Sequence, residues 1–275
     1  MPFRTHVGRS LDFSYPSNRL IALLTLAALV AGGAIALSGG PRGAWLAPVN
    51  TFLVWALVRE LDPDHDSTAI VAAVAAAAWV LLGQDPSAWL FVGGMVLAAR
   101  LVLNSTGRRP LVSDFYWVAA ASILIALFSP SAEGWVAGFG IAIALYVDDR
   151  LAAQHNIRAV VAAVIAAVGA SAAALLTGVF PLSVVAIEPM AVLGYGLLGL
   201  LVVVRDPLPP TSTVDAKTQL PMEQGRLHAA RALVGGLIFI AALFVARRAV
   251  ALVPPAIGLG LALVADQVAR IRQAR

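Results

Sequence analysis

The sequence contains no cysteine and only one lysine, Lys217, among its 275 residues. The lack of cysteine excludes disulfide bonds, thiolate metal sites, iron–sulfur clusters and cysteine nucleophiles. Lys217 lies in a polar, proline-rich stretch, so a Schiff base on a lysine inside an apolar helix is excluded as well.

Charged residues are also scarce, at 12% of the chain, whereas hydrophobic residues make up 60% and the mean hydropathy is +0.87. A soluble domain carries about a quarter charged residues, so this chain has too little polar surface to cover a soluble fold. The cationic residues cluster at the ends of apolar segments, not on one basic face. We therefore expect an all-α polytopic membrane protein with the lipid bilayer as a partner and no nucleic-acid partner.

Ten apolar segments are predicted to be transmembrane helices arranged as one domain, 19–275, after a polar N-terminal segment, 1–18. A span of the hydrocarbon core needs about 20 residues, and several segments are shorter, so short or tilted helices are expected. The segments are 19–38, 43–58, 67–83, 88–104, 112–129, 134–147, 158–179, 182–204, 227–246 and 250–269.

The distribution of Lys and Arg predicts the orientation of these helices. The two termini and alternate loops hold 16 of the 19 cationic residues, and the opposite loops hold only Arg42, Arg247 and Arg248. Cytoplasmic loops are enriched in Lys and Arg. Both termini are therefore expected in the cytoplasm, with the chain in the inner (plasma) membrane of the cell.

Polar residues recur where every second segment reaches the cytoplasm, which suggests five degenerate helical hairpins and an internal repeat. Transporters form their sites where such repeats meet. Arg100 lies inside its apolar segment, where a guanidinium needs a carboxylate or an anionic ligand. A cytoplasmic vestibule for an anionic ligand is therefore predicted, lined by Arg59, Glu60, Arg100, Asn104, Asp148, Asp149, Arg205 and Asp206.

The acidic stretch RELDPDHD, residues 59–66, leaves two other interpretations open. It is typical of a solvated, proline-terminated helix exit, in which Asp66 or Ser67 caps the next helix. Alternatively, Asp62 and Asp64 hold Mg²⁺ in a membrane enzyme that processes a lipid or prenyl diphosphate.

Two further features bear on function. Glu188, followed by Pro189, is an intramembrane carboxylate, which indicates either an ion or proton relay or a helix end at the interface. The longest polar loop, 205–226, contains four prolines and exceeds an ordinary connection. It is predicted to dock partner subunits, and a membrane scaffold that acts through this loop is a third possible function.

The C-terminal quarter, residues 205–275, carries motifs that resemble the NqrB/RnfD family of membrane subunits. The motifs are RDPLPPTST from 205, QGRLHAARALVGG from 224, and a last apolar segment that opens VPPAIGLG and is followed by a basic tail; DSTAIVAAV, residues 66–74, is similar to another helix start of that family. The family positions fall on Asp206, Pro207, Thr211, Gly225, Arg226, Pro254 and Asp266.

The resemblance implies a ten-helix, channel-like fold and a role in ion-pumping, flavin-dependent electron-transfer complexes. The Ser-Gly-Ala-Thr sequence to which that family attaches flavin covalently is absent. This absence argues against covalent flavin attachment and leaves the cofactor open, with a non-covalent flavin as one candidate.

Overall fold

The computed structural model describes residues 11–83, 89–107, 111–129, 132–152, 156–179, 221–244 and 260. Within these residues the chain forms eight α-helices and one 3-10 helix, which confirms the all-α class. The elements are α1 (Pro16–Leu37), η1 (Arg42–Leu46), α2 (Ala47–Leu61), α3 (Asp66–Leu81), α4 (Trp89–Leu103), α5 (Val112–Phe128), α6 (Ala132–Leu151), α7 (Ile157–Leu176) and α9 (Gln224–Phe244).

Eight of the ten predicted segments coincide with these helices. The segment 182–204 and all of 250–269 except residue 260 lie outside the described residues, so the ten-helix count stays a prediction. Two boundaries need correction. The segment 43–58 divides into η1 and α2, and α9 begins at Gln224, so the predicted loop 205–226 ends three residues too late.

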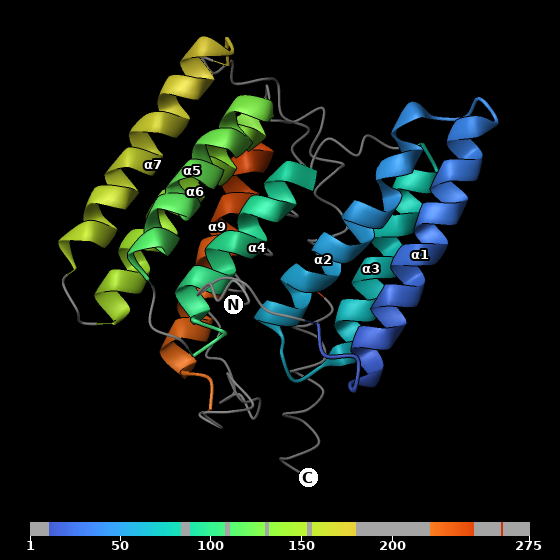
Figure 1. The fold of residues 1–275 in the computed structure, drawn as a ribbon, viewed down its shortest axis with the longest axis horizontal. Helices are drawn as coiled ribbons and strands as arrows, with labels where there is room; N and C mark the ends of the chain where they lie inside the picture. Colours follow the sequence, from blue (N-terminus) through green and yellow to red (C-terminus); the bar gives the residue numbers. More distant parts are fainter. Residues whose placement is uncertain are drawn as a thin grey trace.

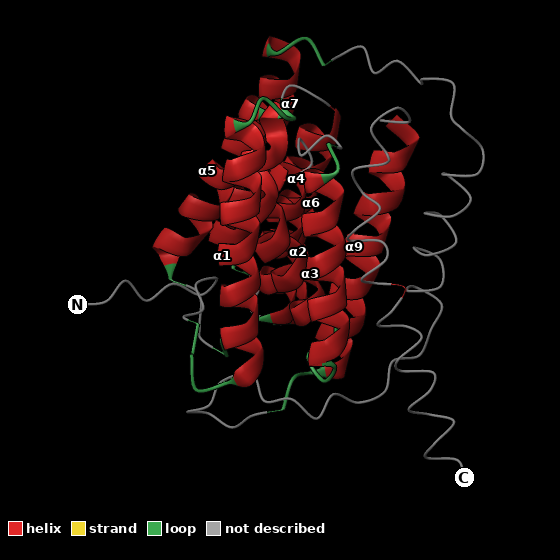
Figure 2. Cartoon of the chain, turned by 90° about the vertical axis from the view of Figure 1, so that its right-hand side faces the viewer, coloured by secondary structure: helices red, strands yellow, loops and turns green. Residues whose placement is uncertain are grey.

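The helices form two groups of three joined by a pair (Figure 1). Helices α1, α2 and α3 pack together on one side, and α5, α6 and α7 on the other; α4 contacts α2 and α6, and α9 packs against α4 and α6. The helices extend along one shared direction, with most loops at the two ends (Figure 2).

The bundle has inner and outer helices. More than half of the residues of α2, α4 and α6 are buried, but fewer than half of those of α1, α3, α5 and α7. Large apolar side chains of the outer helices are exposed, among them Leu23 (63%), Trp117 (67%) and Val168 (64%). Of the described helices, α1 and α7 are long and apolar enough to cross a membrane; α3, α4 and α5 are apolar but shorter.

Small residues allow the inner helices to approach closely. A Cβ atom on Gly94 of α4 would lie 2.8 Å from the Cβ of Ala137 on α6. One on Gly138 would lie 2.8 Å from the carbonyl oxygen of Ser122 on α5, and the Ser122 hydroxyl donates to the Gly138 carbonyl at 2.8 Å. Such close backbone contacts are typical of helices that associate within a membrane.

Candidate functional site at the polar end

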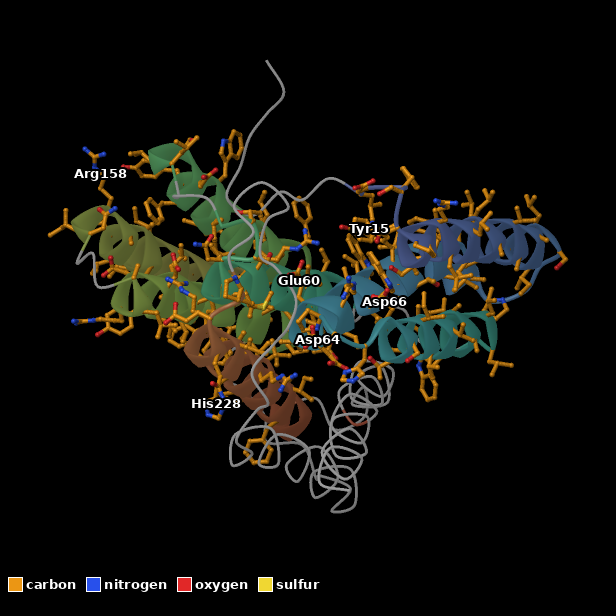
Figure 3. The ribbon with its side chains drawn as sticks, turned by 90° about the horizontal axis from the view of Figure 1, so that it is seen from below. Tyr15, Glu60, Asp64, Asp66, Arg158 and His228 are labelled. Carbon is orange, nitrogen blue, oxygen red and sulfur yellow. The ribbon has the colours of Figure 1, made fainter. Side chains whose placement is uncertain are left out.

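Charged side chains gather at one end of the bundle, where α2, α4 and α6 end and α9 begins. Seen from this end, Glu60 lies among the helices near the middle of the molecule, and Arg158 extends outward at its edge (Figure 3). We call this region the polar end and define it by Glu60, Asp62, Arg100, Asp148, Asp149, Arg226 and Arg231. All of these residues except Arg100 are buried.

The first ion pair of the polar end joins α2 to α4. Arg100 Nε donates to Glu60 Oε1 at 2.8 Å, and the two side chains are 21% and 5% exposed. Seven residues before each partner, Leu53 of α2 lies against Gly93 of α4. Seven residues are about two helical turns, so both contacts lie on the same faces of two parallel helices. Glu60 is thus the carboxylate that Arg100 was expected to need.

Only one oxygen of Glu60 takes part in this pair. Glu60 Oε2 is buried and has no hydrogen-bond partner among the described residues. Buried polar atoms in folded proteins nearly always have a partner, so an exception points to an unfilled role at that atom. The ion pair between Glu60 and Arg100 therefore leaves one buried carboxylate oxygen without a hydrogen bond among the described residues.

The second ion pair joins α9 to α6 and α4. Arg226 Nη1 donates to Asp148 Oδ1 at 2.6 Å and to the Val102 carbonyl at 2.8 Å. The Arg226 and Asp148 side chains are 9% and 8% exposed, and the exposed Glu223 carboxylate lies 3.3 Å from Arg226 Nε. The Val102 carbonyl belongs to the last turn of α4, where helix carbonyls lack partners within the helix. Arg226 therefore supplies both a counter-charge and a C-terminal cap.

A second arginine of α9 makes the same kind of contact with α2. Arg231 is buried, and its Nε donates to the carbonyl of Leu61, the last residue of α2, at 2.8 Å. The sequence predicts no site role for Arg226 beyond the family motif, and none for Arg231. A signal exists nevertheless: Arg226 lies in the first turn of an apolar helix, beside the positive end of its dipole, and Arg231 lies further inside the same helix. Both therefore need partners from elsewhere in the fold.

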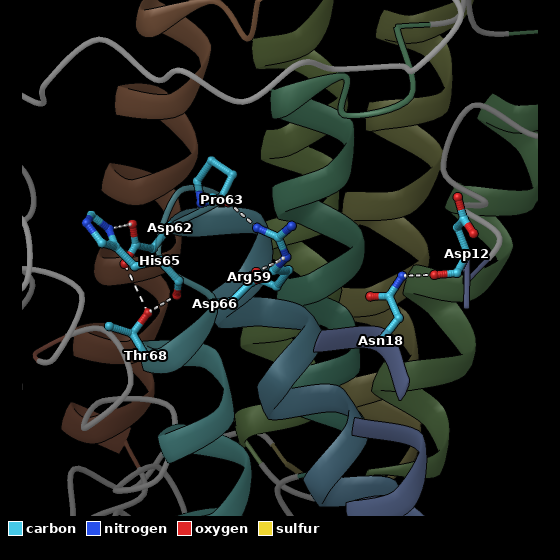
Figure 4. A network of polar contacts seen from close by, with 8 residues as sticks. All are labelled: Asp12, Asn18, Arg59, Asp62, Pro63, His65, Asp66 and Thr68. Carbon is cyan, nitrogen blue, oxygen red and sulfur yellow. Dashed lines mark hydrogen bonds and ion pairs between the residues drawn. The ribbon is translucent and has the colours of Figure 1, made fainter. Parts of the chain in front are cut away.

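The turn between α2 and α3 is closed by its own side chains (Figure 4). Asp62 is buried; its Oδ1 lies 2.8 Å from His65 Nδ1, and its Oδ2 accepts from the Thr68 hydroxyl at 3.0 Å. Arg59 Nε lies 3.0 Å from Asp66 Oδ1, and its guanidinium also donates to the Pro63 carbonyl. Much of the charge in RELDPDHD therefore holds the turn that reverses the chain.

The expectation of a solvated helix exit is only partly right. Asp64 and Asp66 are exposed, but Glu60 and Asp62 are 4% and 1% exposed. The predicted cap by Asp66 or Ser67 is wrong, because His65 holds the N-cap position of α3 without a side-chain cap bond. Asp66 is the first helical residue, and it pairs with Arg59 instead of capping the backbone.

Two predicted ligand residues have local structural contacts. Asn104 follows the last residue of α4 with φ of 49°, and its N–H bonds to the Arg100 carbonyl at 3.0 Å, so it ends the helix in the left-handed conformation that Asn tolerates. Asp149 Oδ1 accepts from the backbone N–H of Asn156 at 2.7 Å and so fixes the connection to α7. The Asn104 side-chain oxygen is buried without a partner among the described residues.

The structure therefore brings together Glu60 with Arg100, and Asp148 with Arg226. Arg59 stays in the α2–α3 turn. Glu188, Arg205 and Asp206 lie outside the described residues.

The described residues give no support to a magnesium site at Asp62 and Asp64. No three acidic, histidine or cysteine side chains within them are placed to share a metal ion. Asp62 is instead bonded to His65 and Thr68, and Asp64 is exposed.

No family model, curated protein or solved structure matches the chain. The similarity to the NqrB/RnfD family therefore stays a prediction that depends on the quoted motifs.

Proposed function

We propose that this chain is a multi-pass subunit of the inner (plasma) membrane that binds an anionic or flavin-like ligand at the polar end, for transport or within a membrane complex. The proposal includes ten transmembrane helices with both termini in the cytoplasm. The polar end then faces the cytoplasm. A relation to ion-coupled electron-transfer subunits is part of the proposal and depends on the sequence motifs.

The exterior of the bundle supports a membrane location. Exposed leucine and valine side chains cover the outer faces of α1 and α7. Tyr15, Tyr116 and Trp117 are exposed near the helix starts at the polar end, and Trp45 is exposed at the opposite end. Tyrosine and tryptophan are enriched at both membrane–water interfaces. This pattern suits a bilayer whose two surfaces lie near the two ends of the bundle.

Arg100 is the single observation that carries the ligand proposal. It is the one member of the polar end that is not buried, and a buried carboxylate holds its Nε. A guanidinium presents five donors in a planar fork that suits carboxylates and phosphates. Arg100 holds Glu60 through Nε and is the more exposed partner of the pair, so an oxyanion from solvent reaches this guanidinium first.

Two other parts of the proposal depend on the sequence alone. Glu188 is proposed to serve as an ion or proton relay, because an ionisable group inside an apolar segment is costly to keep. Partner subunits are proposed to bind the 205–226 loop. Both lie largely outside the described residues.

The test is an anion-binding measurement on purified protein in lipid nanodiscs. Sulfate, inorganic phosphate and flavin mononucleotide are titrated against the wild type, Arg100→Leu and the control Arg158→Leu, in which an exposed arginine at the start of α7 is removed. Hydrogen bonds to charged groups contribute about 1.5–3 kcal/mol, so Arg100→Leu should weaken binding by about 10- to 150-fold. Arg158→Leu should have no effect. Equal binding by all three proteins would contradict the proposal.

A further inference from the structure

We propose that α6 carries a binding site for an anionic phospholipid, with the lipid phosphate at Arg150 and one acyl chain along the exposed face of the helix. This inference rests on the membrane location in the proposed function, but it does not use the anion site at Arg100. It assigns a partner of stated chemistry, a lipid with a negative headgroup, to a surface of the bundle that the proposed function does not use.

The site is a stripe of exposed side chains on a helix that is otherwise covered. The inner helices α2 and α4 are described throughout, and none of their residues is exposed. Helix α6 is also described throughout, and it has four exposed residues, spaced at intervals of four, three and four. Residues with this spacing share one face of a helix. We call them the α6 stripe: Phe139, Ile143, Tyr146 and Arg150.

The neighbours of α6 show where the stripe faces. Successive residues of a helix point about 100° apart, so four residues in a row sample its whole circumference. Ala137 faces α4, Gly138 faces α5 and α7, and Gly140 faces α9. Phe139 lies between the last two directions and is 38% exposed. The α6 stripe therefore points outward between α7 and α9, where the surroundings of the bundle reach an inner helix.

The length of the stripe matches one leaflet of a bilayer. Phe139 and Arg150 are 11 positions apart, which corresponds to about 16 Å along a helix. Half of a hydrocarbon core is about 15 Å thick. Arg150 lies in the last turn of α6, at the polar end. In a membrane, one acyl chain whose headgroup lies beside Arg150 therefore covers the stripe down to the middle of the bilayer.

The stripe ends in a cation that is held in place by an aromatic ring. Arg150 is exposed, and its Nε donates to the Tyr146 hydroxyl at 3.0 Å. Its guanidinium carbon lies 5.0 Å from the centre of the Tyr146 ring, within the range of a cation–π contact. Tyrosine is enriched at membrane–water interfaces. This pair therefore places the guanidinium at the depth where phospholipid headgroups lie.

The acidic neighbours of Arg150 do not neutralise it. Asp148 pairs with an arginine of α9, and Asp149 accepts from a backbone N–H in the connection to α7. Both side chains are buried, whereas Arg150 is exposed. Within the described part of the chain Arg150 forms no ion pair, and a guanidinium binds phosphate through parallel hydrogen bonds. The positive charge at the end of the stripe is thus complementary to a negative headgroup.

The apolar part of the stripe favours a lipid over a free phosphate ion. Phe139 and Ile143 present no donor to an ion, but in a bilayer an acyl chain must cover them. The chain that does so brings its own headgroup next to Arg150. A basic residue near the membrane surface favours anionic lipid by about fivefold. The stripe therefore selects among lipids by headgroup charge, while the chain contact holds the lipid in place.

The test uses the absence of cysteine from the chain. The full chain carrying Ile143→Cys is labelled with a bimane fluorophore and reconstituted in phosphatidylcholine vesicles that contain increasing fractions of a lipid with brominated acyl chains. Bromine quenches the fluorophore on contact. Brominated phosphatidylglycerol should quench at about a fivefold lower fraction than brominated phosphatidylcholine. The same label at Val168→Cys, on the exposed face of α7, should be quenched equally by both lipids.

Two charge variants locate the headgroup. Arg150→Gln in the Ile143→Cys background should abolish the preference for phosphatidylglycerol. Arg19→Gln, which removes an exposed arginine at the polar end of α1 on the other side of the bundle, should keep it (Figure 1). Inorganic phosphate in amounts equal to the brominated lipid should leave the preference unchanged. If it removes the preference instead, the site takes free phosphate and the lipid assignment is wrong.

The outcomes separate this inference from the proposed function. Equal quenching of the Ile143→Cys label by the two lipids would overturn the lipid site and leave the anion site at Arg100, which sulfate binding tests, unaffected. A preference that Arg150→Gln does not alter would also overturn it. If neither brominated lipid quenches the labels at Ile143→Cys and Val168→Cys, both the lipid site and the membrane location in the proposed function are wrong.

Discussion

The inner and outer helices have similar composition but different surroundings. Helix α4 and helix α7 are both rich in alanine, valine and leucine, yet most residues of α4 are buried and fewer than half of those of α7 are. The inner helices α2, α4 and α6 each carry an ionic residue in the last turn that pairs with another helix, and the outer helix α7 has no charged residue after Arg158. Apolar composition is therefore common to inner and outer helices, and the ionic last turn is what distinguishes the inner helices α2, α4 and α6.

The largest loss of stability is expected when the ion pair between Arg226 and Asp148 is broken. Arg226→Leu leaves Asp148 buried without its counter-charge and the Val102 carbonyl without a donor. Breaking a buried pair on one side typically costs about 3–5 kcal/mol. We expect a loss of this size in the free energy of unfolding, measured by chemical denaturation in detergent.

Two control variants sharpen this prediction. The double variant Arg226→Leu with Asp148→Leu should recover much of the loss, because it removes both charges. On an outer helix, Arg158→Leu should change stability by less than about 0.5 kcal/mol. A large loss of stability in Arg158→Leu would contradict the expected difference between inner and outer helices.

A smaller loss of stability is expected where the outer helix α1 packs against η1. A Cβ atom on Gly32 would collide with the carbonyl oxygen of Ala44 in η1, whereas one on the adjacent Gly33 would meet no atom within 4 Å. Gly32→Ala should therefore destabilise by about 1–3 kcal/mol through overpacking. Gly33→Ala should stabilise by up to about 1 kcal/mol, since alanine favours the helix.

Thermal unfolding of the two alanine variants gives the comparison directly. Each substitution adds one methyl group at one of two adjacent residues of the same helix, so their difference isolates the contact with η1. Equal melting temperatures would show that α1 does not pack closely against η1.

The smallest effect, on the pKa of a single carboxyl group, is expected in the exposed segment just before α1. Two hydrogen bonds from Ser14, from its backbone N–H at 2.9 Å and from its hydroxyl, lower the pKa of the Asp12 carboxyl. A lowered pKa in the folded state stabilises the fold above the ordinary pKa of the group, and this contribution is lost as the pH falls through the lowered value. Ser14→Ala should move the pKa of Asp12 back toward its ordinary value.

An NMR titration of the Asp12 carboxyl measures this change. Asp12 is fully exposed, and its carbonyl also accepts from the Asn18 side chain at 2.7 Å (Figure 4). Asn18→Ala removes that bond without touching the carboxylate and is the matched control. An Asp12 titration unchanged by Ser14→Ala would mean that the hydroxyl does not reach the carboxylate.

The helices were predictable because long apolar runs separated by polar turns determine where a chain can cross a bilayer. Several boundaries extend past the apolar residues into polar ones, since the helix continues as long as its backbone bonds are made. Helix α2 thus includes Glu60 and α6 includes Asp148 and Asp149. Hydropathy alone cannot place these ends.

The partners within the polar end were only partly predictable. Arg100 was identified because a charge inside an apolar run demands a partner, but nothing in its local sequence names Glu60, 40 residues away. Arg226 and Asp148 are 78 residues apart, and Arg231 and Leu61 are 170 apart. Such pairs depend on which helices pack together, and the spacing of residues along the chain does not predict that packing.

The dependence of the polar end on α9 also sets an order of assembly. A ribosome completes Asp148 well before it reaches Arg226, and 78 residues take roughly 4–16 s to synthesise. During that interval the nascent protein holds an acidic group inside its helices with no arginine to neutralise it. Biogenesis of this protein therefore has a late closing step, and nascent chains that lack α9 are the ones that quality-control proteases should recognise.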